Sequence, residues 1–396
     1  MFSTPLGRAV LARFVSRVGG EAAFFVGIWG KATFEFRATA TELAVVMGAL
    51  GLASLVGSLW SGYLVDRFGP KRVLVWFEVA FVPTALAVTL AGDLRQLTVL
   101  VFLIGLVGAP VYTAVASLAP YLTDDPTELA RINSWLEGAG WAAFIMGPAA
   151  GALAVRYVSL DSIFVLDAAT SLIGALLVAR ITLRPAPTHR SHARLREELV
   201  AGARFAFSRP DLRFVLLAGT SVWLAYGAFS ALEPLFYREV LRTGPEALGW
   251  VNSVFGLGLV AGTLVVPRLP PFWRSTRGLA VAVALNGAAG LVYVGTNRMP
   301  VVVAGAVLWG WVIGLLVPVY RTLLQTRTPH ELTGRVQATS QTLADTMRLV
   351  PLLLVPVLAV RFGVQPVLIA DVIGLAILGL VLISAAGRYE TVPLES

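Results

Sequence analysis

Twelve apolar stretches, most of them about 20 residues or longer, dominate this sequence. They fall at 9–34, 43–65, 72–92, 96–121, 134–157, 162–183, 213–237, 247–267, 277–296, 300–324, 336–360 and 366–386. A helix of about 20 residues spans the hydrocarbon core of a bilayer. The chain is 57% hydrophobic and 14% charged, whereas soluble domains have about 25% charged residues. The sequence therefore predicts an all-α membrane protein with twelve transmembrane helices, and argues against a soluble enzyme or a disordered chain.

The longest polar segment separates the stretches into two sets of six. We expect an N-terminal six-helix half at 1–183, a cytoplasmic linker at 184–212 and a C-terminal half at 213–396. Within the linker, residues 193–207 have an amphipathic pattern that predicts a helix on the inner membrane face; a site for a regulatory partner is the weaker alternative. Arginine and lysine are concentrated in alternate loops, which places both termini in the cytoplasm and the chain in the inner membrane.

The two halves resemble each other at an offset of roughly 204 residues. Residues 126–131 match 329–335 with one insertion, and Asp167 falls on Asp371. Each match is weak, but the constant offset indicates a parallel duplication of six spans. Such a duplication is typical of transporters whose halves, related by a pseudo-two-fold axis, rock about a site at the membrane midplane.

The loop between the second and third stretches carries a motif of small, acidic and basic residues. Its members are Gly62, Asp66, Arg67, Gly69, Lys71 and Arg72. The glycines permit close backbone approach, and the acid can accept charge-assisted hydrogen bonds from an arginine or a helix N-terminus. We interpret the motif as a conformational latch, with Arg131 and Arg335 as candidate partners. The alternative is that these charges only set the topology.

This motif resembles the loop signature of the major facilitator superfamily, and the resemblance covers the whole chain. Gly147, Pro148 and Gly151 resemble the glycine-proline motif of its drug–proton antiporters. Segments 166–172, 195–199 and 334–336 resemble the enterobactin-exporter and macrolide-efflux branch, and 16–21 resembles lysophospholipid transporters. The resemblance implies the major facilitator fold, alternating access and a bias toward export. For the glycine-proline motif, plain helix packing is an equal alternative.

A few charged residues fall inside the apolar stretches, where a carboxylate costs about 2.5–3.5 kcal/mol. The candidates for proton coupling are Glu21, Glu137, Asp345 and Glu233. Arg17 and Arg348 are candidate cavity charges, four residues from Glu21 and three from Asp345. For each acid the alternative is a structural ion pair. Glu78 also lies within a stretch, and the matching positions of Asp167 and Asp371 indicate a structural role.

Aromatic residues could line a substrate path. The candidates are Phe24, Phe25, Tyr112, Trp141, Tyr226, Phe229, Trp309 and Tyr320. Interfacial anchoring is the more usual role of tryptophan in a membrane protein. The chain has no cysteine, and its three histidines fall in expected loops, so we expect neither a metal site nor a cofactor. A phosphate-binding loop is absent, which argues against direct drive by ATP.

The sequence therefore predicts a secondary transporter that works by alternating access. We expect proton-coupled export of amphipathic or lipophilic small molecules by a monomer in contact with membrane lipids. Transport of a lysophospholipid or another lipid is the alternative. A non-transporting scaffold or receptor is a third possibility, which the loop motif disfavours. The net charge of +8 is explained by basic cytoplasmic loops, so we expect no nucleic-acid partner.

The latch hypothesis predicts that Asp66→Asn abolishes transport while the protein still inserts into the membrane, because the amide cannot accept charge-assisted bonds of the same strength. Transport and membrane abundance should be measured on the same cells. Normal transport by this variant would contradict the latch.

Overall fold

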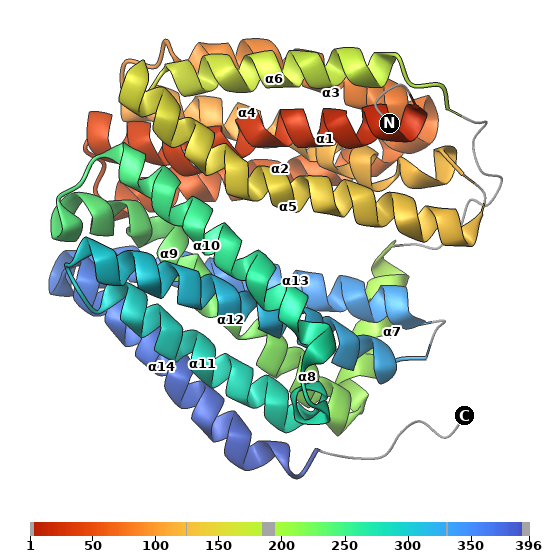
Figure 1. The fold of residues 1–396 in the computed structure, drawn as a ribbon, viewed down its shortest axis with the longest axis vertical. Helices are drawn as coiled ribbons and strands as arrows, with labels where there is room; N and C mark the ends of the chain where they lie inside the picture. Colours follow the sequence, from red (N-terminus) through yellow and green to blue (C-terminus); the bar gives the residue numbers. More distant parts are fainter. Residues whose placement is uncertain (1–3, 124, 184–194, 330–331, 390–396) are drawn as a thin grey trace. The chain divides into compact units, whose positions relative to one another are not determined.

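The computed structural model describes residues 4–123, 125–183, 195–329 and 332–389. These residues form helices and no strands (Figure 1), so the expectation of an all-α protein is confirmed. They fall into two compact units. The first unit comprises residues 1–190 and 242–253, and the second comprises 191–241 and 254–396. The break at residue 190 lies inside the expected linker, whose own bounds stay predictions.

Six long helices build most of the first unit. They are α1 (Pro5–Ala22), α2 (Ala40–Phe68), α3 (Pro70–Val88), α4 (Leu94–Ala116), α5 (Pro126–Tyr157) and α6 (Ser162–Ala179). Two π-helical segments, η1 (Ala23–Ile28) and η2 (Lys31–Glu35), prolong α1, and a 3₁₀ turn, η3 (Ala119–Tyr121), follows α4. The chain between α2 and α3 turns at Gly69, whose φ of +81° is unfavourable for any residue with a side chain.

The remaining helices belong mainly to the second unit. They are α7 (Leu195–Ser208), α8 (Pro210–Thr220), α9 (Val222–Leu235), η4 (Phe236–Leu241), α10 (Pro245–Val265), η5 (Val266–Arg268), η6 (Pro271–Arg274), α11 (Thr276–Val294), α12 (Met299–Thr326), α13 (Thr333–Phe362) and α14 (Val364–Ala386). The first residues of α10, up to Ser253, are grouped with the first unit. The twelve expected stretches thus all form helices.

Ten helical segments in the described part of the chain are long and apolar enough to cross a membrane by length and composition alone. The expected first and third spans, α1 and α3, are not among them. α1 carries Arg13, Arg17 and Glu21, and α3 carries Glu78 besides the two basic residues at its start. Both helices outside this set carry several charged residues, whereas α6, which is in the set, brings a single acid, Asp167, into the interior of the first unit.

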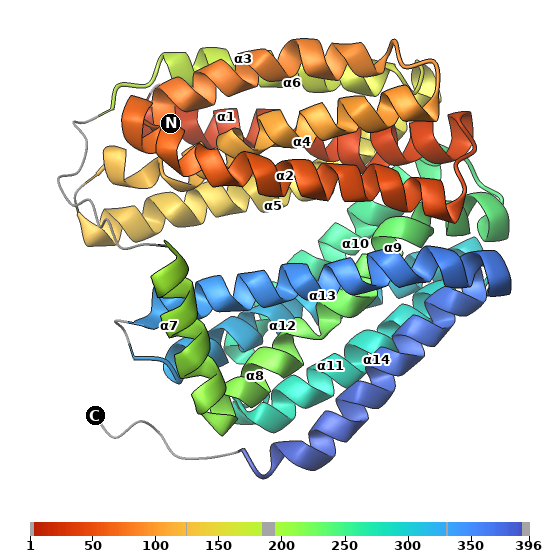
Figure 2. The ribbon, with the colours of Figure 1, turned by 180° about the vertical axis from the view of Figure 1, so that it is seen from behind.

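Helix pairing follows the same pattern within each unit (Figures 1 and 2). In the first unit α1 packs against α5 and α6, and α3 packs against α4 and α6. In the second unit α9 packs against α13 and α14, and α11 packs against α12 and α14. Equivalent helices of the sequence repeat therefore make equivalent contacts, as a duplicated six-helix unit requires.

Small residues let the helix backbones touch within each unit. A side-chain carbon added at Gly57 of α2 would lie 2.7 Å from Ala109 Cβ of α4. In the second unit, a carbon added at Gly310 of α12 would lie 2.0 Å from the carbonyl oxygen of Phe255. Close backbone approach at small residues is how helices pack in lipid, where the hydrophobic effect between helices is weak. Large apolar side chains such as Leu59 and Leu353 point outward instead, as lipid-facing residues do.

Residues 195–207 of the amphipathic segment belong to α7, which ends two residues before Pro210 opens α8; residues 193 and 194 lie outside the described chain. α7 packs against α13. A carbon added at Gly202 would lie 2.4 Å from the carbonyl oxygen of Arg335, so part of this helix is covered by protein. Its placement on the inner membrane face remains a prediction.

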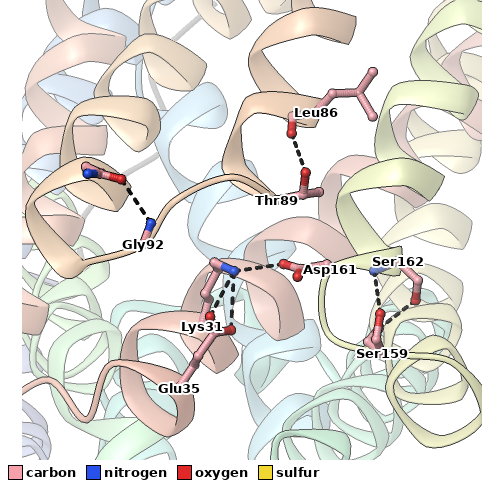
Figure 3. Close-up of polar contacts among 9 residues, drawn as sticks. Lys31, Glu35, Leu86, Thr89, Gly92, Ser159, Asp161 and Ser162 are labelled. Carbon is pink, nitrogen blue, oxygen red and sulfur yellow. Dashed lines mark hydrogen bonds and ion pairs between the residues drawn. The ribbon is translucent and has the colours of Figure 1, made fainter.

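A buried lysine ties the end of the first span to the loop before α6 (Figure 3). Lys31 Nζ lies 2.8 Å from Asp161 Oδ1 and 3.1 Å from Glu35 Oε1. The lysine side chain is 1% exposed, whereas the two acids are about half-exposed. The π-helical turn at Lys31 and the loop before α6 are thereby held together by one buried cation.

We expect Lys31→Met to lower the free energy of unfolding by about 1–3 kcal/mol, because it strips a buried hydrogen-bonding partner from two acids. Arg131→Met is the control, since Arg131 pairs with Glu128 at an exposed site and such pairs contribute about 0–1 kcal/mol. Thermal unfolding of the two purified variants tests this. Equal destabilisation by both substitutions would contradict the assigned role of Lys31.

Candidate functional site: a charged cavity in the first unit

One face of α1 presents charged side chains toward the interior of the first unit. Arg13, Arg17 and Glu21 are spaced four residues apart, so they line up along one side of the helix. Arg17 Nε lies 2.6 Å from Glu21 Oε1, so the two side chains form an ion pair. The N–H group of Nε does not point at the carboxylate as a hydrogen bond requires. The glutamate side chain is 9% exposed and the arginine 38%. The structure therefore contains the pair that the sequence spacing allows.

Helix α5 covers Glu21 through the glycine-proline motif. A carbon added at Gly147 would lie 2.5 Å from Glu21 Cβ and 2.8 Å from the carbonyl oxygen of Val18. One turn further, a carbon at Gly151 would lie 2.9 Å from Val26 Cγ2. These glycines let α5 lie directly on α1. The motif therefore buries the acid of the ion pair.

A cavity of about 180 Å³ opens beside this face of α1. Helices α1, α3, α4 and α6 supply most of its wall. Its polar lining includes Arg13, Ser16, Arg17, Glu78, Tyr112 and Asp167, and its apolar lining includes Leu74, Phe81, Val111 and Val115. A cavity with charged and apolar walls can hold a molecule that is itself amphipathic.

A second cavity of about 160 Å³ shares part of this wall. It is lined by Arg13 and Tyr112 together with Asn133 and Glu137 of α5. The Arg13 guanidinium lies 6.0 Å from the centre of the Tyr112 ring, within the range of a cation–π contact. Arg13 therefore stands between the two cavities, and Glu137 faces the second of them.

Two buried acids of the larger cavity were not among the coupling candidates. Glu78 of α3 is 5% exposed, and its Oε1 accepts a hydrogen bond of 2.7 Å from Ser16 Oγ of α1. Asp167 of α6 is 1% exposed. The sequence shows that both residues are acids inside apolar stretches. It does not show that α3 and α6 pack against the charged face of α1.

Glu233, the expected coupling acid of the seventh span, lies in a separate cluster within the second unit. It is buried, and its Oε1 accepts a hydrogen bond of 2.6 Å from Tyr293 Oη. The Tyr293 and Tyr237 hydroxyls lie 2.8 Å apart. The rings of Phe229 and Trp309 pack within about 6 Å of Tyr293. These two aromatic candidates therefore belong to the packed surroundings of Glu233.

The structure does not join Asp345 to Arg348. The Arg348 guanidinium lies 4.8 Å from the ring centre of Trp223 and 4.9 Å from that of Tyr226. The Asp345 carboxylate is exposed and accepts a hydrogen bond of 3.2 Å from Gln341 Nε2. Both aromatic rings belong to α9, so Arg348 is held by cation–π contacts with a neighbouring helix.

The acid of the expected latch is exposed. Asp66 makes no ion pair with Arg131 in the structure; Arg131 instead lies 3.3 Å from Glu128 Oε1. Arg335 belongs to the second unit, at the start of α13. The latch itself therefore stays a prediction.

The other residues of the loop motif differ in their contacts. Lys71 Nζ donates a hydrogen bond of 2.6 Å to the carbonyl oxygen of Ile181, just beyond the end of α6. Arg67 donates to the hydroxyl of Tyr63. Gly62 and Arg72 are exposed. The lysine thus anchors the loop to α6, where a cation is favoured by the helix dipole.

The other aromatic candidates divide between the units. Phe24 and Phe25 form an edge contact with ring centres 4.9 Å apart, and Phe25 also meets Phe144 of α5. Trp141 of the same helix is exposed. Tyr320 is buried in the second unit, where its hydroxyl lies 2.5 Å from Ser340 Oγ. A role of Tyr320 in a substrate path stays a prediction.

The described residues contain no group of three or more histidine, cysteine, aspartate or glutamate side chains that could hold a metal ion.

Comparison with known proteins relates most of the chain to membrane transporters. The family profile described as "Major Facilitator Superfamily" matches residues 9–350. The multidrug efflux pump Tap of Mycobacterium tuberculosis is 29% identical over 370 residues, which cover 89% of this chain and 87% of the pump. The enterobactin exporter EntS of Escherichia coli is 26% identical over 354 residues, which cover 84% and 80%.

Two solved structures share the fold. The nucleoside transporter NupG matches with a TM-score of 0.75 at 13% identity, covering 98% of this chain and 100% of that one. A bacterial homolog of the human lysosomal transporter Spinster matches with a TM-score of 0.71 at 12% identity, covering 98% of both chains. At these identities the likeness shows the fold alone.

We expect Gly147→Ala to destabilise the protein by about 1–3 kcal/mol, because the added methyl group must displace Glu21 and the backbone of α1. Gly138→Ala, on the same helix, is the matched control, since a carbon there meets nothing within 4 Å. Thermal unfolding of both purified variants tests the contact. A Gly147→Ala protein as stable as the control would show that α5 does not press on Glu21.

Proposed function

The chain belongs to the major facilitator superfamily and is a membrane transporter, and from this premise we propose that it exports amphipathic or lipophilic small molecules in exchange for protons. The proposal includes alternating access, a location in the inner membrane with both termini in the cytoplasm, and a monomer as the working unit. Relatives named as a multidrug efflux pump and an enterobactin exporter support export.

One observation carries the proposal: the Arg17–Glu21 pair, whose acid is buried, lies beside a cavity that has both charged and apolar walls. The apolar side chains suit the lipophilic part of a substrate, and the arginines and acids suit its polar part. Such a cavity discriminates by amphipathic character more than by exact shape, because apolar contact is not directional.

Proton coupling follows from competition within this pair. When Glu21 is ionised, it holds the guanidinium of Arg17 at 2.6 Å. A proton arriving from outside neutralises Glu21 and frees Arg17, which changes the electrostatic potential in the cavity. Glu137 in the second cavity is the next candidate for the same task, and we place Asp345 and Glu233 after it. Substrate and proton then favour different states of the transporter, which is what coupling requires.

Lysophospholipid transport is the second candidate. Arg13 and Arg17 both face the larger cavity, and Arg13 Nε is buried without a hydrogen-bond partner. A phosphate head group would satisfy such an arginine, and the apolar wall would take the acyl chain. Flux of a fluorescent lysophospholipid through proteoliposomes, in the absence of a pH gradient, would favour this candidate over drug export.

We expect Glu21→Gln to reduce proton-driven export of ethidium from proteoliposomes at least about tenfold, equivalent to about 1.4 kcal/mol, because the amide cannot bind the proton and holds Arg17 less strongly than the carboxylate does. Glu239→Gln is the control, since Glu239 forms an exposed pair with Arg238. Ethidium flux that is indifferent to an imposed pH gradient in the unmodified protein would contradict proton coupling.

A further inference from the structure

Two acids, Glu78 and Asp167, line the larger cavity together with Arg17, and the geometry points to a second proton-binding site there, separate from Glu21. We propose that Asp167 of α6, with Glu78 of α3 beside it, binds and releases a proton. Proton binding by this site is independent of the transported molecule. Its part in coupling rests on the proposed function.

The close contact of α1 and α6 fixes Asp167 and shields it from solvent. A carbon added at Gly19 of α1 would lie 2.0 Å from Thr170 Oγ1, 2.8 Å from Asp167 Cα and 3.0 Å from Asp167 Oδ1. Any side chain at Gly19 would therefore collide with α6. The glycine lets α1 cover the aspartate directly, and Asp167 is left 1% exposed at the wall of the cavity.

Both carboxyl oxygens of Asp167 are buried and lack a hydrogen-bond partner among the described residues. A buried carboxylate without a partner costs several kcal/mol, whereas a neutral carboxyl group costs far less. Occupancy by a proton therefore accounts for an acid in this position. A metal ion would require several converging oxygen ligands, and no cluster of three potential ligand residues exists in the described chain.

Glu78 gives the site its second carboxyl group. Its Oε1 accepts the hydrogen bond from Ser16 Oγ, and a carbon added at Gly174 of α6 would lie 3.7 Å from the same oxygen. Glu78 and Asp167 thus reach one cavity from α3 and α6. Two buried acids in one cavity cannot both be ionised without mutual repulsion, so a proton is favoured on one of them.

Two of the three basic groups around the site are engaged elsewhere. Among the described residues no ion pair joins Asp167 or Glu78 to an arginine or lysine. The helices packed against α6 bring Arg13, Arg17 and Glu21 from α1, Glu78 and Lys71 from α3, and Glu137 from α5. Arg17 is paired with Glu21, and Lys71 binds the carbonyl oxygen of Ile181 beyond the end of α6.

Arg13 is the basic group that can respond when the proton leaves. It is half-buried, its Nε lacks a hydrogen-bond partner, and it lines both cavities. Release of the proton leaves a negative charge in the larger cavity, which attracts the guanidinium away from Tyr112 and Glu137 in the second cavity. Proton occupancy at Asp167 thereby changes the charge that the second cavity presents to a substrate.

Infrared difference spectroscopy of the purified full-length protein tests the site directly. We expect a carbonyl band of a protonated carboxyl group that disappears reversibly as the pH is raised, and we expect Asp167→Asn to abolish it. Proton release into unbuffered detergent solution, followed with a pH-indicator dye, should fall by about one proton per molecule, since an amide carries no titratable proton. Asp93→Asn is the control, because Asp93 is an exposed helix cap in the same unit.

Three results would overturn the proposal: no protonated band, a band that persists at every pH, or a band that Asp167→Asn leaves unchanged. If this variant does not fold, unmodified protein labelled with ¹³C-aspartate replaces it, and the band must then shift in frequency. A band that does not shift belongs to glutamate and also overturns the assignment to Asp167.

A transport measurement separates this site from the proposed function. In proteoliposomes Asp167→Asn should still equilibrate ethidium but lose its proton-driven accumulation. If ethidium is not transported by the unmodified protein, the proposed function fails while the infrared result for Asp167 stands. If ethidium accumulation by Asp167→Asn is normal, the site has no part in coupling and the inference is overturned in that respect.

Discussion

The cost of placing charge inside a bilayer, about 2.5–3.5 kcal/mol for a carboxylate, governs the architecture of the first unit. Helix α1 carries three charged residues on one face, of which Arg13 and Arg17 line the larger cavity and Glu21 is buried. Gly147 of α5 presses on Glu21, and Gly19 of α1 presses on the helix that carries Asp167. Small residues thus let the neighbouring helices bury the acids of this region.

The second unit meets the same constraint with different chemistry. Glu233 is enclosed by tyrosine hydroxyls, and Arg348 is enclosed by aromatic rings of α9. Helix pairing repeats between the units, and Asp167 and Asp371 occupy matching positions. The ion pair and charged cavity of the first unit differ from the aromatic surroundings of Glu233 and Arg348 in the second.

The spacing of residues along one helix predicted a contact correctly where both partners lie on that helix and no other helix competes for them. Arg17 and Glu21 are four residues apart, and they meet. Asp345 and Arg348 are three residues apart, yet the arginine turns to α9 because two aromatic rings there offer a better contact. Glu78 and Asp167 could be seen as acids in apolar stretches, but their convergence on α1 depends on which helices pack together. That information is not contained in the spacing of residues along one helix.

The sequence by itself determined the all-α membrane fold, the twelve spans, the six-plus-six repeat and the superfamily resemblance. It could do so because lipid forces every backbone polar group into a helix and leaves length and hydropathy as sufficient signals. Only the tertiary structure decided which charged residues share a cavity, which glycines bury them and which acids are left without a partner. Those outcomes depend on contacts between helices that are far apart in the chain, where a difference of one methyl group decides whether two backbones can touch.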